Sequence, residues 1–483
     1  MQLKRLSFNS DLFSVRYIDG AAAKINPGKM STLGERSNKF EVILRFRDWS
    51  QTMRHHRVWL LSAMLLSLLI PLASAEEPAK WAESHVDKLI PLYQHLHQHP
   101  ELSFQEKETA KRLGEELKKS GAEVTFGVGG HGVVGVMKNG DGKQLMIRTD
   151  LDALPVAEQT PLKFASKVKV ENPTGSGMVS VMHACGHDVH ITNLVGVAQY
   201  LAAHKNEWKG TVVFIGQPAE ERVRGAEAML ADGLYQRFGK PDFALALHVS
   251  PIVPTGMVAY RGGFAMANVD SVDISVKGIG GHGAHPHTTV DPIVQAAQLI
   301  LALQTIVSRE VKPIEPAVVT VGSIHGGAKH NIIDDQCHLQ LTVRSYSPQV
   351  RKQILAAITR KANGIAMAAG AAEPEIKISE GTDAVFNHLD LVERLVPVFR
   401  KALGEKNVLE APQTMGAEDF GLYARGGVPI MMFGLGSITA ERMKRIGRPM
   451  SLHSPLYYPD VRPTLVTGIT VMSAAALDLL GKE

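Results

Sequence analysis

The spacing of apolar side chains predicts helices and strands from about residue 81 onwards. Residues Gln105 to Lys119 follow an amphipathic helical pattern that ends just before Gly121, a residue typical of the position after a helix. A second helix is predicted from about Asp188 to His204. Short apolar runs predict the strands of an open sheet, at Glu123 to Val128, Val133 to Lys138, Gln144 to Thr149, Thr211 to Gly216 and Phe243 to Leu247. The last two runs are rich in Val, Ile, Leu and Phe, as buried parallel strands are.

The pattern changes between about Arg261 and Glu375. Strands and helices there follow the β-α-β-β-α-β order of a ferredoxin-like unit. The predicted elements are strands at Ser271 to Lys277, Ala317 to Ser323, Cys337 to Arg344 and Glu375 to Ile378, and helices at Asp291 to Arg309 and Pro348 to Ala369. We interpret this unit as an inserted domain, because residues with metal-binding chemistry lie both before and after it.

The fold class that follows is α/β, with an open mixed sheet flanked by helices and an inserted ferredoxin-like α+β domain. A chain of 483 residues exceeds what one hydrophobic core usually organises. We expect a catalytic domain in two parts, residues 76–261 and 375–483. Residues 262–374 between them would form a lid that also mediates dimerisation.

The first 75 residues have a different composition. Basic residues from Arg54 to Arg57 precede an apolar run from Val58 to Leu72, and Ala73-Ser74-Ala75 follows. This order is typical of a secretory signal peptide, here residues 53–75, cleaved after Ala75. The run of about 15 residues is shorter than the roughly 20 that cross a bilayer as a helix. We therefore expect a periplasmic or secreted protein without a stable membrane span. Residues 1–52 form an upstream extension to which the pattern assigns no role.

The charge of the remaining chain excludes one class of partner. The whole sequence has 52 basic and 48 acidic residues, of which the first 75 residues hold 11 and 5. The rest therefore has 52 − 11 = 41 basic and 48 − 5 = 43 acidic residues. The numbers of basic and acidic residues are thus nearly equal. This balance does not indicate a basic patch of the kind that binds nucleic acid.

Candidate metal ligands occur in four separated segments. Cys185 and His187 lie in the stretch from Val181 to Asp188, Glu221 follows the strand that ends near Gly216, and His248 follows the run that ends at Leu247. His453 comes after the inserted domain. Open α/β sheets collect ligands at the carboxyl ends of their strands. Thiolate, imidazole and carboxylate ligands in this number predict a site for two divalent cations.

Three neighbouring residues leave alternatives open. His183 is a rival ligand by its spacing from Cys185, and His190 is either a residue of a helix face or a donor that supports a ligand. Cys185 and Cys337 are both expected as free thiols, because Cys337 belongs to an alternating run that faces a core. Glu220 and Glu221 are adjacent and point in different directions from an extended backbone. One can therefore bind metal while the other acts as a base.

These motifs together resemble the M20 family of metallopeptidases and amidohydrolases, in the branch of hippurate hydrolases, auxin-conjugate hydrolases and N-acyl-amino-acid amidohydrolases. The resemblance covers nearly all of residues 83–480. It rests on the motifs His97 to Glu106, Arg148 to Pro155, Met182 to Asp188, Pro218 to Glu221, Gly280 to His287, Met415 to Phe420 and His453 to Pro455.

The resemblance implies a ligand set and a catalytic base. The implied metal ligands are Cys185, His187, Glu221, His248 and His453, and the implied base is Glu220. Asp150 keeps its place in the strand-end motif, where the family has it beside a metal-binding His. That His is replaced by Arg148 in this chain, so the role of Asp150 is open.

Residues of the inserted domain complete the implied site. His282 corresponds to a family histidine that reaches an active site, commonly that of the partner subunit of a homodimer. Asn331 and Arg344 correspond to contacts of the substrate carboxylate, which the guanidinium fork of an arginine suits. Gly434 either lets the substrate approach the backbone closely or forms a turn.

The expected activity is metal-dependent hydrolysis of the amide bond of an N-acyl amino acid. A carboxypeptidase or dipeptidase would use the same metal centre with a different pocket. A non-catalytic binding protein is disfavoured, because the implied base and ligands are all present. Zinc or manganese are the expected metals, and the mixed ligand set also admits cobalt or nickel.

Overall fold

The computed structural model describes residues 77–173 and 175–481. The predicted signal peptide and the upstream extension lie outside these residues. The larger sheet has eight strands in the order β1-β2-β6-β3-β7-β18-β8-β17. The bounds are β1 Glu123–Val128, β2 Gly132–Asn139, β3 Gln144–Asp150, β6 Gly210–Gln217, β7 Phe243–Pro254, β8 Val258–Tyr260, β17 Val408–Glu410 and β18 Ile430–Ile438.

The sheet is mixed, as the sequence predicted. Strands β6, β3, β7 and β18 run parallel to one another. Strands β1 and β2 join one side as antiparallel strands, and β8 pairs antiparallel with β18 on the other side. The carboxyl ends of the parallel strands meet at one edge, where Asp150 of β3 pairs with Gln217 of β6 and Gly434 of β18 pairs with His248 of β7. The strand-end residues singled out in the sequence therefore lie at this edge.

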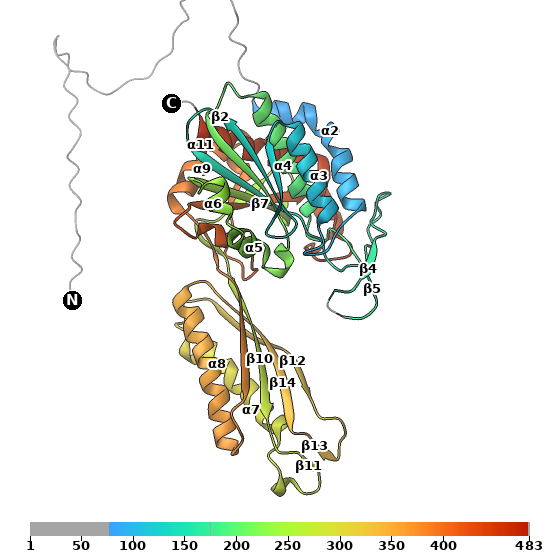
Figure 1. Ribbon diagram of the computed structural model, residues 1–483, viewed down its shortest axis with the longest axis vertical. Coiled ribbons are helices and arrows are strands. Elements are labelled where there is room, and N and C mark those ends of the chain that lie inside the picture. The colour runs from blue at the N-terminus through green and yellow to red at the C-terminus, as the bar shows by residue number, and fades with distance from the viewer. Residues whose placement is uncertain (1–76, 174, 482–483) are drawn as a thin grey trace, which may run out of the picture. The chain divides into compact units, whose positions relative to one another are not determined.

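Alternating side chains bury both faces of this sheet. Leu145 and Ile147 of β3 belong to one apolar cluster, and Met146 between them belongs to the other. The helices of the larger cluster are α2 Pro78–Gln98, α4 His187–Ala203, α9 Leu389–Leu403 and α11 Val461–Leu480, with α3 Lys107–Lys119 beside them (Figure 1). The opposite face is covered by α5 Gly225–Ala231, α6 Leu234–Phe238 and the turn η5 Asp419–Ala424.

Helix α11 is long and apolar enough to cross a membrane by length and composition. However, 72% of its most apolar window is buried inside the fold. Its residues Leu465, Ile469 and Met472 belong to the larger apolar cluster. Burial of this kind is what a core helix requires, and it explains why α11 is apolar around most of its circumference.

The inserted domain contains a four-stranded antiparallel sheet in the order β12-β14-β10-β15. Its strands are β10 Asn268–Lys277, β12 Ala317–Gly326, β14 Gln336–Ser345 and β15 Glu375–Thr382. Helices α7 Pro292–Thr305 and α8 Pro348–Ala369 pack on the sheet through a separate apolar cluster (Figure 1). Since β15 pairs along β10, the fourth strand of this sheet lies beyond the predicted boundary at residue 374.

Short elements connect the two sheets and extend them. Strand β11 Gly281–His282 comes shortly after the end of β10 and pairs with β13 Ile332–Ile333 in a two-stranded ribbon. Strands β9 Gly263–Met266 and β16 Val385–Asn387 pair where the chain enters and leaves the inserted domain. The remaining elements are the hairpin β4 Lys169–Glu171 and β5 Met178–Ser180, α10 Ala440–Ile446, and the short turns η1 Glu220–Arg222, η2 Pro286–Thr288, η3 Ile306–Glu310 and η4 Glu405–Asn407.

Candidate metal centre

The five predicted ligands lie together at the carboxyl edge of the larger sheet. Their potential ligand atoms form overlapping groups in which all atoms lie within 4.8 Å of one another. Cys185 belongs to one group with His187 and His248, and to another with Glu221 and His453. Two of the separations are 3.4 Å, from Cys185 Sγ to His248 Nε2 and from His453 Nε2 to Glu221 Oε1. The structure thus brings together residues that span nearly 270 positions of sequence.

Local backbone conformation places these side chains. Gly186, between Cys185 and His187, has a φ of 79° and directly precedes α4. A side chain at Gly186 would meet Val249 at 2.7 Å, so this turn requires glycine. The peptide N–H of His453 donates to the carbonyl of Ala184 at 2.9 Å, which ties the last ligand segment to the first.

Two of the histidines present the ring nitrogen that a metal needs. His187 donates through Nδ1 to the carbonyl of Asp152 at 2.7 Å, and His248 donates through Nδ1 to the carbonyl of Val249 at 2.8 Å. In both rings Nε2 is therefore the nitrogen with a free lone pair. His187 Nε2 is buried without a hydrogen-bond partner in the part of the chain that the structure describes. Buried polar atoms are costly when unpaired, so this donor set fits a bound cation.

The electrostatics of the centre also favour a cation. Burial lowers the pKa of His187, but Asp150, Asp152 and Glu221 outweigh it and raise this pKa to about 10. Burial raises the pKa of the Cys185 thiol, and neighbouring carboxylates raise it further. The negative charge of the carboxylates at this centre thus exceeds the positive charge of the side chains around them. A divalent ion would supply the missing positive charge and would bind the thiol as thiolate.

Glu220 occupies a different position from its neighbour. Its Oε2 lies 3.9 Å from His187 Nε2. Its carboxylate also lies within 4.8 Å of the carboxylates of Glu418 and Asp419. Burial raises the pKa of Glu220 well above its usual range, and the negative charges of Glu418 and Glu221 add to that increase. Glu221 also approaches His187, with its Oε1 at 3.8 Å from Nε2. The two glutamates lie on the short 3₁₀ helix η1 and not on an extended backbone, so both carboxylates reach His187 while only Glu220 also neighbours Glu418 and Asp419.

Asp150 belongs to a buried ionic network. Arg148 donates to Asp150 Oδ2 at 2.8 Å, to Glu418 Oε1 at 2.8 Å and to Asp419 Oδ1 at 3.1 Å. His190 donates through Nδ1 to Asp150 Oδ1 at 2.7 Å. Although burial opposes it, His187, His190 and Arg148 hold the pKa of Asp150 well below its usual range. Asp150 is thus an ionised partner of Arg148 and His190.

The structure distinguishes between the histidines whose roles the sequence left open. His190 supports the centre, because its Nε2 accepts the N–H of Val249 at 2.9 Å beside the candidate ligand His248. His183 is buried, and neither of its ring nitrogens has a hydrogen-bond partner among the described residues. It belongs to none of the potential ligand groups there. Both cysteines are free thiols, as predicted.

The predicted residues of the inserted domain do not gather at this centre. His282 and Asn331 lie together on the β11–β13 ribbon, where the N–H of Gly283 donates to the carbonyl of Asn331. Arg344, near the end of β14, donates through Nη1 to the carbonyl of Met415 at 2.8 Å. Gly434 pairs with His248 in the sheet, and a methyl group there would make ordinary contacts at 3.6 Å. The surrounding protein therefore leaves room for a methyl group at this position.

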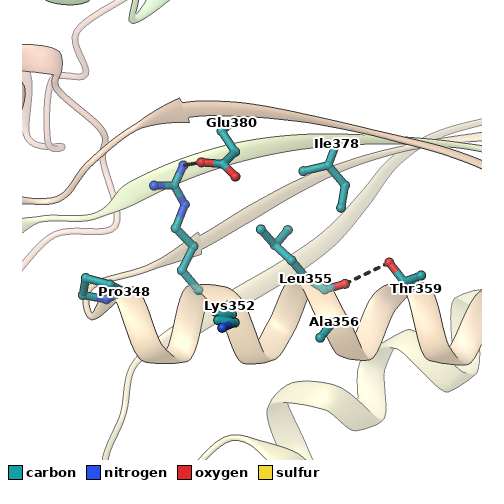
Figure 2. Close-up of a pocket in the computed structure, with 8 residues that line it drawn as sticks. Pro348, Lys352, Leu355, Ala356, Thr359, Ile378 and Glu380 are labelled. Atoms are coloured by element: carbon teal, nitrogen blue, oxygen red, sulfur yellow. Dashed lines mark hydrogen bonds and ion pairs between the residues drawn. The ribbon is translucent and has the colours of Figure 1, made fainter.

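A surface groove of about 640 Å³ lies elsewhere, between α8 and β15 of the inserted domain (Figure 2). Lys352, Leu355 and Ile378 line it, and Arg351 pairs there with Glu380 at 3.7 Å. It contains none of the predicted ligands, so we do not assign the metal chemistry to it.

Several residues support the centre in roles that the sequence did not predict, among them Asp152, which the sequence placed only at the end of a buried strand. Asp152 accepts the N–H groups of both Glu220 and Glu221, at 3.2 Å and 3.0 Å. Glu418 and Asp419 were noted only as part of a motif, and their pairing with Arg148 was not predicted. Arg148 in a buried strand was the signal from which these partners could have been predicted, since a buried guanidinium requires carboxylate partners.

Comparison with known proteins agrees with this geometry. The chain matches the peptidase family M20/M25/M40 over residues 146–473. It is 39% identical over 332 residues to the hippurate hydrolase of Campylobacter jejuni, covering 68% of this chain and 82% of that protein. It is 36% identical over 356 residues to thermostable carboxypeptidase 2 of Saccharolobus solfataricus, covering 73% and 86%.

A solved structure shows the same fold. The YXEP protein of Bacillus subtilis, described as a dinuclear metal binding peptidase from the M20 family, is 31% identical with a TM-score of 0.67. The match covers 82% of this chain and 99% of that one. This protein therefore belongs to the peptidase family M20/M25/M40 and is a hydrolase of that family.

Proposed function

We propose that the protein hydrolyses the amide bond of N-acyl amino acids, releasing a carboxylic acid and an amino acid. The observation that carries this proposal is the pair Glu220 and Glu221, whose carboxylates lie 3.9 Å and 3.8 Å from His187 Nε2. Glu221 also groups with Cys185 and His453, whereas Glu220 groups with Glu418 and Asp419. The similarity to a hippurate hydrolase supports an N-acyl amino acid as substrate.

Five residues would hold two divalent cations, which are zinc or manganese in our proposal: Cys185, His187, Glu221, His248 and His453. Bound metal ions would lower the pKa of a water molecule and polarise the carbonyl of the scissile amide. The thiol and the imidazoles suit zinc, and the carboxylate also suits manganese.

Glu220 is the group that moves the proton. It would accept a proton from the attacking water and deliver it to the nitrogen of the leaving amine. Its raised pKa suits the second step, because a neutral carboxyl group donates a proton readily. Cations held at the neighbouring ligands would oppose that increase and favour the ionised form needed for the first step.

Arg344 would bind the substrate carboxylate, because its guanidinium fork can donate two parallel hydrogen bonds. It lies near the junction of the two domains, where its Nη1 contacts the carbonyl of Met415 and Tyr346 donates to the carbonyl of Thr414. Gly434 would line the substrate site next to His248, its neighbour in the sheet.

His282 would act in the metal centre of a partner subunit. Strand β10 has ten residues between the domain junction and the β11–β13 ribbon, which corresponds to about 33 Å. His282 on that ribbon is thus distant from the junction in its own subunit, and it is exposed. A histidine positioned there can donate to a developing oxyanion when a second copy presents it. Asn331 on the same ribbon would accompany it.

The partner in this proposal is a second copy, bound through the inserted domain. Strand β12 is an edge of its sheet, and α7 exposes Val294 and Leu301, whose exposed fractions are 53% and 72%. Exposed apolar side chains beside an unpaired edge are typical of an interface. A continuous sheet across two copies would cover them. Sedimentation velocity tests whether the protein is a dimer. A monomer at micromolar concentration would contradict the proposed interface.

Export of the protein is a separate proposal, based on residues 53–75 alone. N-terminal sequencing of the protein recovered outside the cytoplasm tests it. We expect a mature chain that begins at Glu76, and a chain that retains residues 53–75 would contradict cleavage.

A carboxypeptidase is the alternative activity, favoured by the similarity to thermostable carboxypeptidase 2. A panel of benzoyl and acetyl amino acids, compared with simple dipeptides, separates the two after reconstitution with zinc or manganese. We expect faster release of amino acids from the acylated substrates.

Replacing Glu220 with Gln tests the role of the base. We expect kcat to fall by about 10² to 10⁴ while metal content stays unchanged, since general acid–base catalysis contributes on that order. The matched control is E227Q, a glutamate of α5 that is half exposed. Turnover of E220Q equal to that of E227Q would contradict the assignment.

A further inference from the structure

The turn that carries Glu220 and Glu221 has a strained backbone. Ala219 has a φ of 51° and Val223 has a φ of 49°, on either side of the short helix η1. Non-glycine residues in this region are strained and persist only when their surroundings hold them. Something outside the turn must therefore stabilise it.

Two buried carboxylates contact consecutive N–H groups of this turn. Glu106 accepts the N–H of Ala219 through Oε1 at 2.7 Å, and the same oxygen accepts the N–H of Phe104. Asp152 accepts the N–H of Glu220 through Oδ1 and that of Glu221 through Oδ2. Both carboxylates are fully buried, with exposed fractions of 0%.

The two carboxylates are themselves held by the segment before α3. Ser103 donates its hydroxyl to Asp152 Oδ2 at 2.7 Å, and Phe104 has a φ of 64°. This segment belongs to the motif from His97 to Glu106, for which the proposed chemistry has no use. The motif therefore reaches the centre through the backbone of the turn.

We propose that Glu106 and Asp152 are positioning residues that fix the Ala219–Glu221 turn, and with it the directions in which the Glu220 and Glu221 side chains leave the backbone. This proposal rests on the proposed function of the two glutamates. Because adjacent side chains leave the backbone in different directions, a rotation of one peptide unit would redirect both carboxylates. Three N–H groups bound by two buried carboxylates prevent that rotation.

The test uses isosteric variants of the full chain. In D152N one carboxylate oxygen becomes an NH₂ group, which cannot accept an N–H, so one of the two contacts with the turn is lost. Because Asp152 Oδ1 also lies 3.4 Å from His187 Nδ1, hydrogen exchange of the turn is the readout that isolates the turn in this variant. In E106Q the amide oxygen can still accept both N–H groups, whereas E106A removes the acceptor. The matched control is D291N, because Asp291 also accepts two backbone N–H groups, at the start of α7.

Three readouts are compared: calorimetric titration with Zn²⁺ or Mn²⁺ alone, hydrogen exchange of the peptide that contains residues 217–224, and the split between kcat and KM. We expect D152N and E106A to bind metal about 10- to 100-fold more weakly, as removal of groups that orient ligands does. The amides of the turn should exchange faster, and kcat should fall more than KM rises. E106Q and D291N should stay within about twofold of the wild type.

Other outcomes overturn the proposal. Wild-type exchange and metal affinity in D152N would show that the turn does not need its acceptor. Equal losses in E106Q and E106A would show that the bulk of the side chain matters and the acceptor does not. If D152N fails to fold, the comparison of E106Q with E106A still decides. If the wild type hydrolyses no N-acyl amino acid, the proposed function fails while metal titration and exchange still test the positioning.

Discussion

Replacing His97 with Gln should remove a pH-dependent part of the protein's stability. His97 lies on α2 and is buried between two carboxylates, with Nδ1 at 2.7 Å from Asp188 Oδ2 and Nε2 at 3.0 Å from Glu158 Oε1. Both ring nitrogens donate, which only the charged imidazolium can do. Burial lowers the pKa of His97, but the hydrogen bonds to Asp188 and Glu158 outweigh it and raise the pKa to about 9.

The magnitude follows from the difference between the folded and unfolded pKa. A rise from 6.5 to about 9 corresponds to 2.5 pKa units, or about 3 kcal/mol at 1.36 kcal/mol per unit. Because the folded pKa is the higher one, this stabilisation is complete below pH 6.5. It is lost as the pH rises through 9. The wild type should therefore lose up to about 3 kcal/mol between these limits because of His97.

The assay is urea unfolding of the chelator-treated protein at pH 6 and pH 9.5. The free energy of unfolding of the wild type minus that of H97Q should be about 3 kcal/mol larger at pH 6 than at pH 9.5. Other groups that titrate in this window, such as His187, cancel in the difference. H85Q, on the same helix, controls for the loss of an imidazole from α2.

A difference that does not change with pH would refute the reasoning. It would mean that His97 is neutral in the folded protein and contributes only packing. A difference that grows with pH would have the wrong sign for a cation between two carboxylates, and it would also contradict the assigned hydrogen bonds.

Three further predictions concern the centre itself. C185S should lower the metal content per subunit, measured by elemental analysis after dialysis, because a serine hydroxyl is a poorer ligand than a thiolate; full metal content would contradict the assigned ligand. R148M should destabilise the fold by about 3 to 5 kcal/mol in urea unfolding, because it leaves buried carboxylates without their counter-charge; a change below about 1 kcal/mol would show that the network is not ionic. If subunits exchange freely, equal amounts of inactive E220Q and H282A should recover about a quarter of the wild-type activity, because half of the dimers are mixed and each has one intact site. No recovery despite subunit exchange would remove the composite site.

Much of the fold could be predicted because local signals were strong. The whole of α8 was predicted, since Ser347 caps its start and Gly370 ends it in a left-handed conformation. The predicted helix to Arg309 was too long as an α-helix, because α7 ends at Thr305 and a wider π-type turn follows. Apolar periodicity does not distinguish these two helical forms over one turn.

The chemistry of single residues was predictable where ligand spacing constrained it, as at Cys185 and His187. The partners of Arg148 were not, because Glu418 is 270 positions away and no local pattern pairs them. The conformation of Ala219 was also beyond prediction, since alanine rarely adopts a positive φ. Its cause lies in Glu106 and Asp152, which are close only in three dimensions.

His453, the last of the candidate ligands along the chain, has a consequence for biosynthesis. It lies beyond the entire inserted domain, whereas Cys185 and His187 precede that domain. A ribosome must therefore synthesise the whole inserted domain before the candidate ligands can meet around a metal ion. Premature stop codons upstream of this position should give chains that cannot turn over substrate, so translation errors of this kind would not release a partly functional enzyme.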